Sequence, residues 1–164
     1  MTHLPETQEA EVLIVGAGPV GMAMAMDFDQ RGISCIVVER RAFQELPSVK
    51  CNHVSARTME SFRRLGVAGM LRNAGLPEDF EHSVAFRTTA TGHELSRVYI
   101  PPRGKRFTDH SGPDGWWPTP ELPHRINQIF LEPLLQRHLL TLDRVRLLNR
   151  YELVGYTQDD DGVT

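Results

Sequence analysis

Three glycines near the start of the chain have the spacing of a phosphate-binding turn. Gly16, Gly18 and Gly21 follow the apolar run 12–15 and precede a segment rich in helix-forming residues. In such a turn the first glycine permits the sharp bend, the second lets the backbone approach a pyrophosphate, and the third lets the helix pack against the strand. The amino end of the helix then offers N–H groups and a positive dipole to the phosphates. The predicted dinucleotide site comprises Gly16, Gly18, Pro19, Val20 and Gly21.

A carboxylate stands where the ribose of a dinucleotide would be held. Glu39 follows the apolar segment 33–38 and comes 23 residues after Gly16. At the tip of the second strand a carboxylate can accept hydrogen bonds from both ribose hydroxyls; the alternative is an ordinary solvated charge. An unphosphorylated ribose fits FAD or NAD better than NADP, because a 2′-phosphate would meet the charge of Glu39. Arg40 and Arg41 leave this point open, since an arginine could accommodate that phosphate.

The elements that must position these residues form a strand, a helix and a second strand. Residues 12–15 and 33–38 are apolar runs typical of buried parallel strands. Residues 22–31 favour a helix, and Gly32 is a natural stop. This βαβ unit, at about 11–40, predicts an α/β fold of the Rossmann-like type that binds FAD or NAD, with a parallel sheet and an added β-hairpin or meander.

The remainder of the chain alternates helices, strands and two long loops. Ser55 is a candidate N-cap, and Pro133 predicts a kink or a late start in the last helix. The loops are 41–50 and the Pro/Gly-rich segment 101–123, which contains Trp116-Trp117. The expected elements are helices at 55–65, 67–73 and 128–142, a hairpin of 84–87 with 95–100, strands at 145–148 and 151–158, and a turn at Asp161-Gly162.

Composition excludes several kinds of partner. The chain has 164 residues, 40% of them hydrophobic, and a formal charge of −3 without a basic block, so nucleic acid is not expected as a partner. The longest apolar run, 12–26, is too short for a membrane span. Cys35 and Cys51 fall in a predicted strand and a loop, so no disulfide is expected and a cytoplasmic location is favoured. The histidines lack metal-ligand spacing.

Four segments together resemble the single-component FAD-dependent aromatic hydroxylases, the flavoprotein monooxygenases related to para-hydroxybenzoate hydroxylase. The glycine turn with Glu39-Arg40 is shared by many FAD and NAD proteins. The sequences Ala56-Arg-Thr-Met-Glu60 and Arg125-Ile-Asn-Gln128 are much narrower. The four segments, which span nearly the whole chain, are 12–21 with 39–40, 50–60, 62–67 and 125–132.

The resemblance implies a role for each residue that matches the family pattern. The glycines would frame the FAD pyrophosphate, Glu39 would hold the adenosine ribose, and Arg40 would lie on the adenine side. Gln128 would bond the ribityl chain, although by itself it is equally a polar first-turn residue. Lys50 replaces a pyrophosphate-contacting arginine, which keeps the charge but loses the bidentate fork. Val154 would bring backbone groups to the adenine. Arg57 is either a surface ion-pair partner or a cofactor contact.

The resemblance also implies the reaction. NAD(P)H, a transient reductant, would reduce a tightly but non-covalently bound FAD, and a flavin hydroperoxide formed with O2 would hydroxylate a small phenolic or aromatic substrate. Family members are more than twice as long and carry further flavin motifs and a substrate domain. Residues 1–164 are therefore expected to be the N-terminal part of the FAD-binding domain, incomplete relative to the family, without the substrate domain and insufficient alone for turnover.

Two alternatives belong to other classes. The chain could be a non-catalytic flavin- or nucleotide-binding module. It could also belong to another class of FAD oxidoreductase, although Cys35 and Cys51 lack the close spacing of a disulfide reductase's redox pair.

Overall fold

The computed structural model describes residues 8–105, 107–111 and 119–164. The chain forms two compact units, one made of Met1–Ser48 with Leu131–Thr164 and the other of Val49–Phe130. The second unit is thus inserted in sequence between two parts of the first. Within the described ranges, no helix has both the length and the apolar character needed to cross a membrane.

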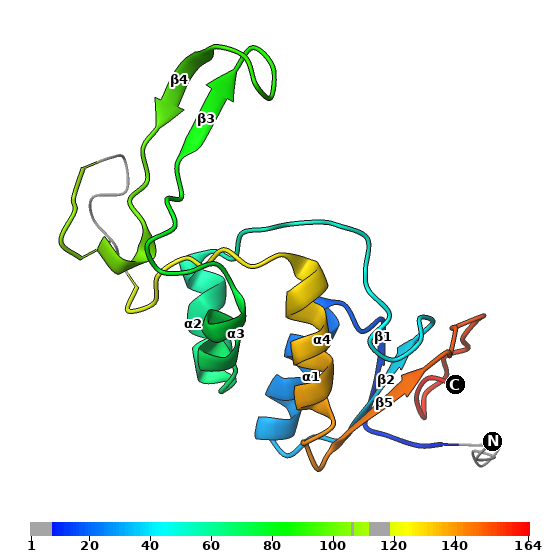
Figure 1. Ribbon diagram of the computed structural model, residues 1–164. Coiled ribbons are helices and arrows are strands. Elements are labelled where there is room, and N and C mark those ends of the chain that lie inside the picture. Colours follow the sequence, from blue (N-terminus) through cyan, green and yellow to red (C-terminus); the bar gives the residue numbers. More distant parts are fainter. Residues whose placement is uncertain (1–7, 106, 112–118) are drawn as a thin grey trace. The chain divides into compact units, whose positions relative to one another are not determined.

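A three-stranded parallel sheet organises the first unit (Figure 1). Its strands are β1 (Val12–Val15), β2 (Cys35–Glu39) and β5 (Val145–Asn149), in the order β1-β2-β5. The register sets Val15 opposite Val38, and Glu39 opposite Asn149. Because all three strands run the same way, their carboxyl ends meet at one edge of the sheet, which is where ligands bind in open α/β sheets. The predicted βαβ unit is confirmed.

Helix α1 (Pro19–Gln30) connects β1 to β2. It begins three residues before the expected start, because proline at the first helical position is already constrained to a helical φ. Its buried side chains are Met22, Ala25 and Met26; full burial of a side chain of methionine size contributes about 1.5–3 kcal/mol. The helix stops as expected at Gly32, whose φ of +78° suits a residue without a Cβ.

Helix α4 (Gln128–Leu139) leads towards β5 and runs through Pro133. Its buried leucines, Leu131, Leu135 and Leu139, recur every four residues, so they share one face of the helix. The helix ends three residues before the expected Leu142, where the N–H and the hydroxyl of Thr141 both donate to the carbonyl of His138. Helix α4 also buries two polar side chains, Glu132 and Gln136.

The strand expected at Tyr151–Gln158 is absent, so the placement of Val154 in a strand was wrong. The chain leaves the sheet at Arg150, which adopts a φ of +65°. Residues 151–157 have no regular structure, and Val154 is 97% exposed. A β-strand needs a continuous partner for its backbone groups. This segment pairs at its two ends instead, at Tyr151 with Glu39 and at Thr157 with Thr164, beside the bridge between Gln158 and Val163. That bridge confirms the turn at Asp161-Gly162.

The second unit contains two helices and a hairpin. Helix α2 (Ala56–Arg64) is capped as expected, since the hydroxyl of Ser55 accepts a hydrogen bond from the N–H of Thr58 at 3.2 Å. Helix α3 (Ala68–Ala74) follows Gly66, whose φ is +82°. The expected short helix and its glycine boundary are therefore confirmed.

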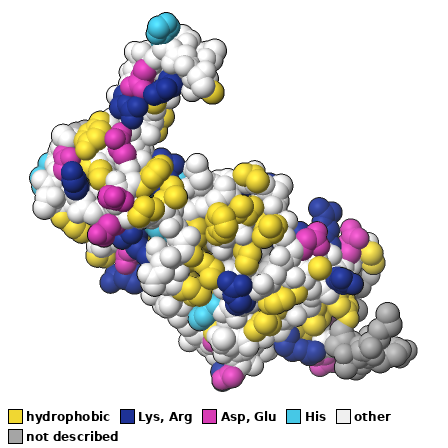
Figure 2. All heavy atoms as spheres, viewed as in Figure 1, with side chains coloured by type: hydrophobic (Ala, Val, Ile, Leu, Met, Phe, Trp, Pro, Cys, Tyr) yellow, Lys and Arg dark blue, Asp and Glu magenta, His cyan; other side chains and the backbone are white. Residues whose placement is uncertain are grey.

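The antiparallel hairpin of β3 (Val84–Arg87) and β4 (Glu94–Val98) is also confirmed. All its side chains are exposed or nearly so, and basic and acidic groups stand together on it (Figure 2). Arg97 pairs with Glu94 and with Glu81, while Arg87 also reaches Glu94. A 3-10 turn, η1 (Arg103–Lys105), follows. The Trp116-Trp117 pair lies outside the described residues.

A buried histidine joins the parts of the second unit. His124 forms an antiparallel bridge with Val54, and its Nε2 lies 2.9 Å from the carbonyl oxygen of Leu71. The imidazole also packs against Gly75, where an added Cβ would lie well inside 3.0 Å of the ring. Burial lowers the pKa of His124 to about 4, although the hydrogen bond to Leu71 acts in the opposite direction. The imidazole is therefore neutral at pH 7, with Nε2 donating to Leu71.

This buried neutral imidazole predicts a pH-dependent stability. Between pH 6.5 and pH 4 the unfolded chain binds a proton at His124 that the folded chain does not, so the free energy of unfolding falls as pH falls through this window. We expect a loss of about 2 kcal/mol between pH 7 and pH 4.5 from this group. Urea denaturation of the wild type and of His124→Gln measures it, because glutamine retains an N–H donor but does not titrate. Identical pH slopes in the two proteins would contradict the prediction.

Candidate functional site

The glycine turn joins the carboxyl end of β1 to α1. Gly16 has a φ of +102°, a conformation that favours glycine. Its N–H donates to the carbonyl of Val38 at 2.8 Å, which ties the turn to the neighbouring strand. The turn is thus fixed by the sheet itself, at the edge where the strands end.

Gly18 and Gly21 face different surroundings. A Cβ at Gly21 would lie well inside 3.0 Å of the carbonyl oxygen of Gly16 and at 3.2 Å from Cγ2 of Ile14, so this glycine permits the close approach of α1 to β1. A Cβ at Gly18 would meet nothing within 4 Å. Gly18 is the N-cap of α1 and supplies no side-chain cap, while the first N–H groups of a helix lack intrahelical acceptors. This open space beside the helix terminus can receive a pyrophosphate.

Glu39 stands at the expected place, at the end of β2, but its side chain is turned inward and the residue is only 6% exposed. One carboxylate oxygen accepts the N–H of Ala17 at 3.0 Å, and the other accepts the N–H of Arg41 at 3.0 Å. The guanidinium of Arg41 donates to both oxygens, at 3.1 and 3.2 Å. Burial opposes the charge of Glu39, but the hydrogen bonds from Arg41 and Ala17 outweigh it and lower its pKa.

These donors occupy the acceptor capacity of the carboxylate. An ionised carboxylate offers about four lone-pair sites, and Glu39 already accepts four hydrogen bonds from Ala17 and Arg41. A ribose hydroxyl must therefore share or replace one of these donors. The side chain of Arg41 is the donor best able to turn, since the other two are backbone N–H groups of the turn and the strand end.

Arg41, whose role the sequence left open, is held by a second carboxylate. Its Nη1 donates to Oε2 of Glu132 on α4 at 2.9 Å, and hydrogen bonds to Glu39 and Glu132 raise the pKa of Arg41. Sequence reasoning did not identify Glu132. The available signal was a carboxylate between Leu131 and Leu135 on the apolar face of a helix, where a charge requires a partner.

Lys50 and Gln128 belong to the second unit, whereas the glycine turn and Glu39 belong to the first. Within the second unit the residue after Lys50 bonds to Gln128: the carbonyl of Cys51 accepts the N–H of Gln128 at 3.1 Å. Arg125 strengthens this link by donating to Oδ1 of Asn52 at 3.0 Å. Lys50 itself is exposed. Lys50 and Gln128 therefore lie on adjoining backbone segments of the second unit.

Arg40 lies at the end of β2, and the segment that carries Val154 starts near it. Arg40 follows Glu39 directly and is exposed. Val154 lies three residues beyond Tyr151, whose N–H donates to the carbonyl of Glu39 at 3.1 Å. The segment that carries Val154 therefore starts beside the predicted ribose site, although it is not a strand. The adenine contacts of Arg40 and Val154 stay predictions.

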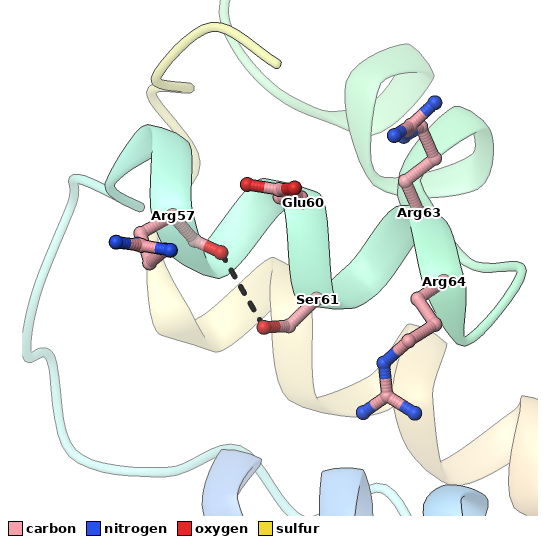
Figure 3. A pocket seen from close by; sticks show the side chains of 5 residues that line it. All are labelled: Arg57, Glu60, Ser61, Arg63 and Arg64. Atoms are coloured by element: carbon pink, nitrogen blue, oxygen red, sulfur yellow. Dashed lines mark hydrogen bonds between the residues drawn. The ribbon is translucent and has the colours of Figure 1, made fainter. Parts of the chain in front are cut away.

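Helix α2 carries a separate arginine-rich depression of about 540 Å³, lined by Arg57, Glu60, Ser61, Arg63 and Arg64. Figure 3 shows Arg63 and Arg64 pointing away from each other, while the hydroxyl of Ser61 donates to the carbonyl of Arg57 at 3.4 Å. Arg63 pairs with Glu121 at 3.4 Å. All five lining residues come from one helix, and this depression does not decide between the two roles of Arg57.

Two curated relatives align with nearly all of the chain. It is 29% identical over 156 residues to phenol 2-monooxygenase of Pseudomonas sp. (strain EST1001), covering 95% of this chain and 25% of that protein. It is 31% identical over 164 residues to a flavin-dependent monooxygenase of Mycobacteroides abscessus, covering 93% of this chain and 30% of that protein. The chain thus spans between a quarter and a third of the length of these relatives.

Two solved structures are also similar to nearly the whole chain. The structure of native and K252c-bound RebC-10x superposes with a TM-score of 0.80 at 34% identity, covering 96% of this chain and 28% of that one. The structure of the flavin-dependent monooxygenase PieE in complex with FAD and substrate superposes with a TM-score of 0.79 at 27% identity. The match covers 98% of this chain and 27% of that one. The family model described as FAD binding domain matches residues 9–164. With the glycine turn and Glu39 at one edge of a parallel sheet, the chain belongs to this FAD binding domain family.

Proposed function

We propose that this chain is the FAD-binding part of an NAD(P)H-dependent flavoprotein monooxygenase that hydroxylates a phenolic or aromatic substrate with O2. The observation that carries the proposal is the glycine turn, in which Gly21 is closed against Gly16 while Gly18 faces open space. That combination leaves room for a pyrophosphate at the amino end of α1. The relatives named above, a phenol monooxygenase among them, support the reaction class.

The residues present fit FAD. The turn from Gly16 to Gly21 would hold the pyrophosphate through backbone N–H groups, with Lys50 adding a positive charge. Glu39 would accept the ribose hydroxyls, Arg40 and the backbone of Val154 would border the adenine, and Gln128 would bond the ribityl chain. When bound, the flavin supplies the redox chemistry by the route that the family resemblance implies. The protein's part is to orient the cofactor and exclude water.

We further propose that residues 1–164 form the N-terminal part of an FAD-binding domain, with the βαβ unit at about 11–40 and the substrate domain outside this chain. The share of the relatives that the chain covers supports this. A cytoplasmic location is supported by the free thiols of Cys35 and Cys51. A coding sequence that ends at Thr164 would contradict the enzyme proposal and favour a non-catalytic binding module.

Flavin retention tests the cofactor assignment. The purified chain is mixed with FAD, passed through a gel-filtration column and examined by visible absorbance; the same is done with NAD+ and ultraviolet detection. We expect FAD to stay with the folded protein and NAD+ to be lost. We also expect no hydroxylation of phenol by the 164-residue chain with NADH or NADPH. Retention of NAD+ in place of FAD would overturn the monooxygenase proposal.

A further inference from the structure

Three charged side chains form a buried cluster within the first unit, the ion triplet Glu39–Arg41–Glu132. The side chains of Glu39 and Glu132 are 7% and 2% exposed, and that of Arg41 is 21% exposed. Arg41 uses Nε and Nη2 on Glu39 and Nη1 on Glu132. The two glutamates come from β2 and α4, so the triplet connects the ribose end of the sheet to a helix far along the sequence.

We propose that Glu132 is a positioning residue that acts through Arg41 on Glu39, and that the ion triplet makes this site select an unphosphorylated ribose. The inference rests on the proposed FAD function, in which Glu39 receives the ribose. It assigns Glu132 and Arg41 a part in cofactor selection in addition to their part in packing.

The charge balance of the triplet supports this selectivity. Two carboxylates face one guanidinium, so the triplet has an excess negative charge that repels a 2′-phosphate. An arginine beside the ribose would normally be the group that accepts such a phosphate. Here the guanidinium already donates to two buried carboxylates, and removing one partner of a buried ion pair is strongly unfavourable. Arg41 is therefore withheld from a 2′-phosphate.

The same arrangement favours the unphosphorylated ribose. To free an acceptor site on Glu39, the guanidinium of Arg41 must turn away from one carboxylate oxygen. Its bond to Glu132, at 2.9 Å, holds the arginine while this happens. Glu132 thus stabilises the state in which Glu39 can accept a ribose hydroxyl. Both effects increase the preference for a ribose with a free 2′-hydroxyl.

A pair of ligands that differ only in that phosphate tests the inference. Calorimetry measures the dissociation constants of ADP-ribose and of 2′-phospho-ADP-ribose for the 164-residue chain. For the wild type we expect ADP-ribose to bind at least about 10-fold more tightly, since like charges in a binding site impose costs of this order. In Glu132→Gln we expect this ratio to fall about 3- to 10-fold, because the ion pair with Arg41 becomes a weaker hydrogen bond to an uncharged amide.

Two further variants separate selection from packing. Gln136→Met removes a different hydrogen bond between α4 and the loop after β2, in which Gln136 accepts the N–H of Gln44 at 2.9 Å, and it leaves Arg41 untouched. We expect its ligand ratio to equal that of the wild type. Arg41→Lys keeps the charge but cannot bridge two carboxylates with a planar fork, so its ratio should fall. If circular dichroism shows that Glu132→Gln does not fold, Arg41→Lys replaces it as the test variant.

The outcomes distinguish this inference from the proposed function. An unchanged ratio in Glu132→Gln and Arg41→Lys, with ADP-ribose bound by the wild type, would overturn the selection role and leave the FAD assignment in place. An equal fall in Gln136→Met would also overturn it, because the effect would then come from packing. Failure of the folded wild type to bind ADP-ribose at all would overturn both proposals.

Discussion

The Gly18→Val variant is expected to lose FAD while keeping its fold. A Cβ at this position would meet nothing within 4 Å beyond its chain neighbours, so we expect the folded chain to accept a side chain there. The backbone of Gly18, with φ of −76° and ψ of 174°, lies in the extended region that valine favours. The valine would instead fill the space that we assign to the pyrophosphate. We expect FAD to bind at least about 100-fold more weakly, a loss of about 3 kcal/mol.

The matched control for this variant lies in α3. Gly69 also faces open space in the structure, but it belongs to no predicted cofactor contact. Gly69→Val should retain FAD as the wild type does. Gly18→Val should melt within a few degrees of the wild type, since valine is a poorer N-cap by about 1 kcal/mol. Undiminished FAD retention by a folded Gly18→Val protein would show that the pyrophosphate does not pass Gly18.

The Gly21→Ala variant should instead lower the stability of the fold itself, independently of cofactor binding. A Cβ at position 21 would collide with the carbonyl oxygen of Gly16, which is backbone and cannot swing aside. Gly16 is in turn tied to Val38 in the sheet. We expect the free energy of unfolding to fall by about 3 kcal/mol, at the upper end of overpacking effects.

Urea denaturation of Gly21→Ala and Gly69→Ala measures this difference. The second substitution adds the same methyl group in a helix where nothing stands in its way. It should be neutral or stabilise the protein by up to about 1 kcal/mol, since alanine is the better helix former. Equal stability of Gly21→Ala and the wild type would mean that α1 can move away from β1 without cost.

Local patterns explain why so much of the first unit could be predicted. The apolar runs of β1 and β2, the helix between them and the capping glycine at position 32 are all encoded by residues close in sequence. Glu39 is likewise placed by its position at the end of a strand. Spacing alone assigned different tasks to Gly18 and Gly21, and only the backbone distances show that one is open and the other closed.

The parts that sequence reasoning missed depend on distant partners. The bond between Arg41 and Glu132 joins residues 91 positions apart, and no local sequence pattern predicts it. The link from Cys51 to Gln128 is of the same kind. The expected strand around Val154 was wrong for a related reason: the alternation of apolar residues supplies a face to bury, but only a neighbouring strand supplies the hydrogen bonds.

The pairing of β2 with β5 has a consequence for how the protein is made. These two strands share a register from Cys35 with Val145 to Glu39 with Asn149, yet the whole second unit is translated between them. At ordinary elongation rates the interval is about 5–20 s. During that time the nascent chain holds β1, α1 and β2 with one edge of β2 still unpaired, and such edges attract other strands. A ribosome-bound chain that stops before Val145 should therefore be more prone to aggregate than one that has released β5.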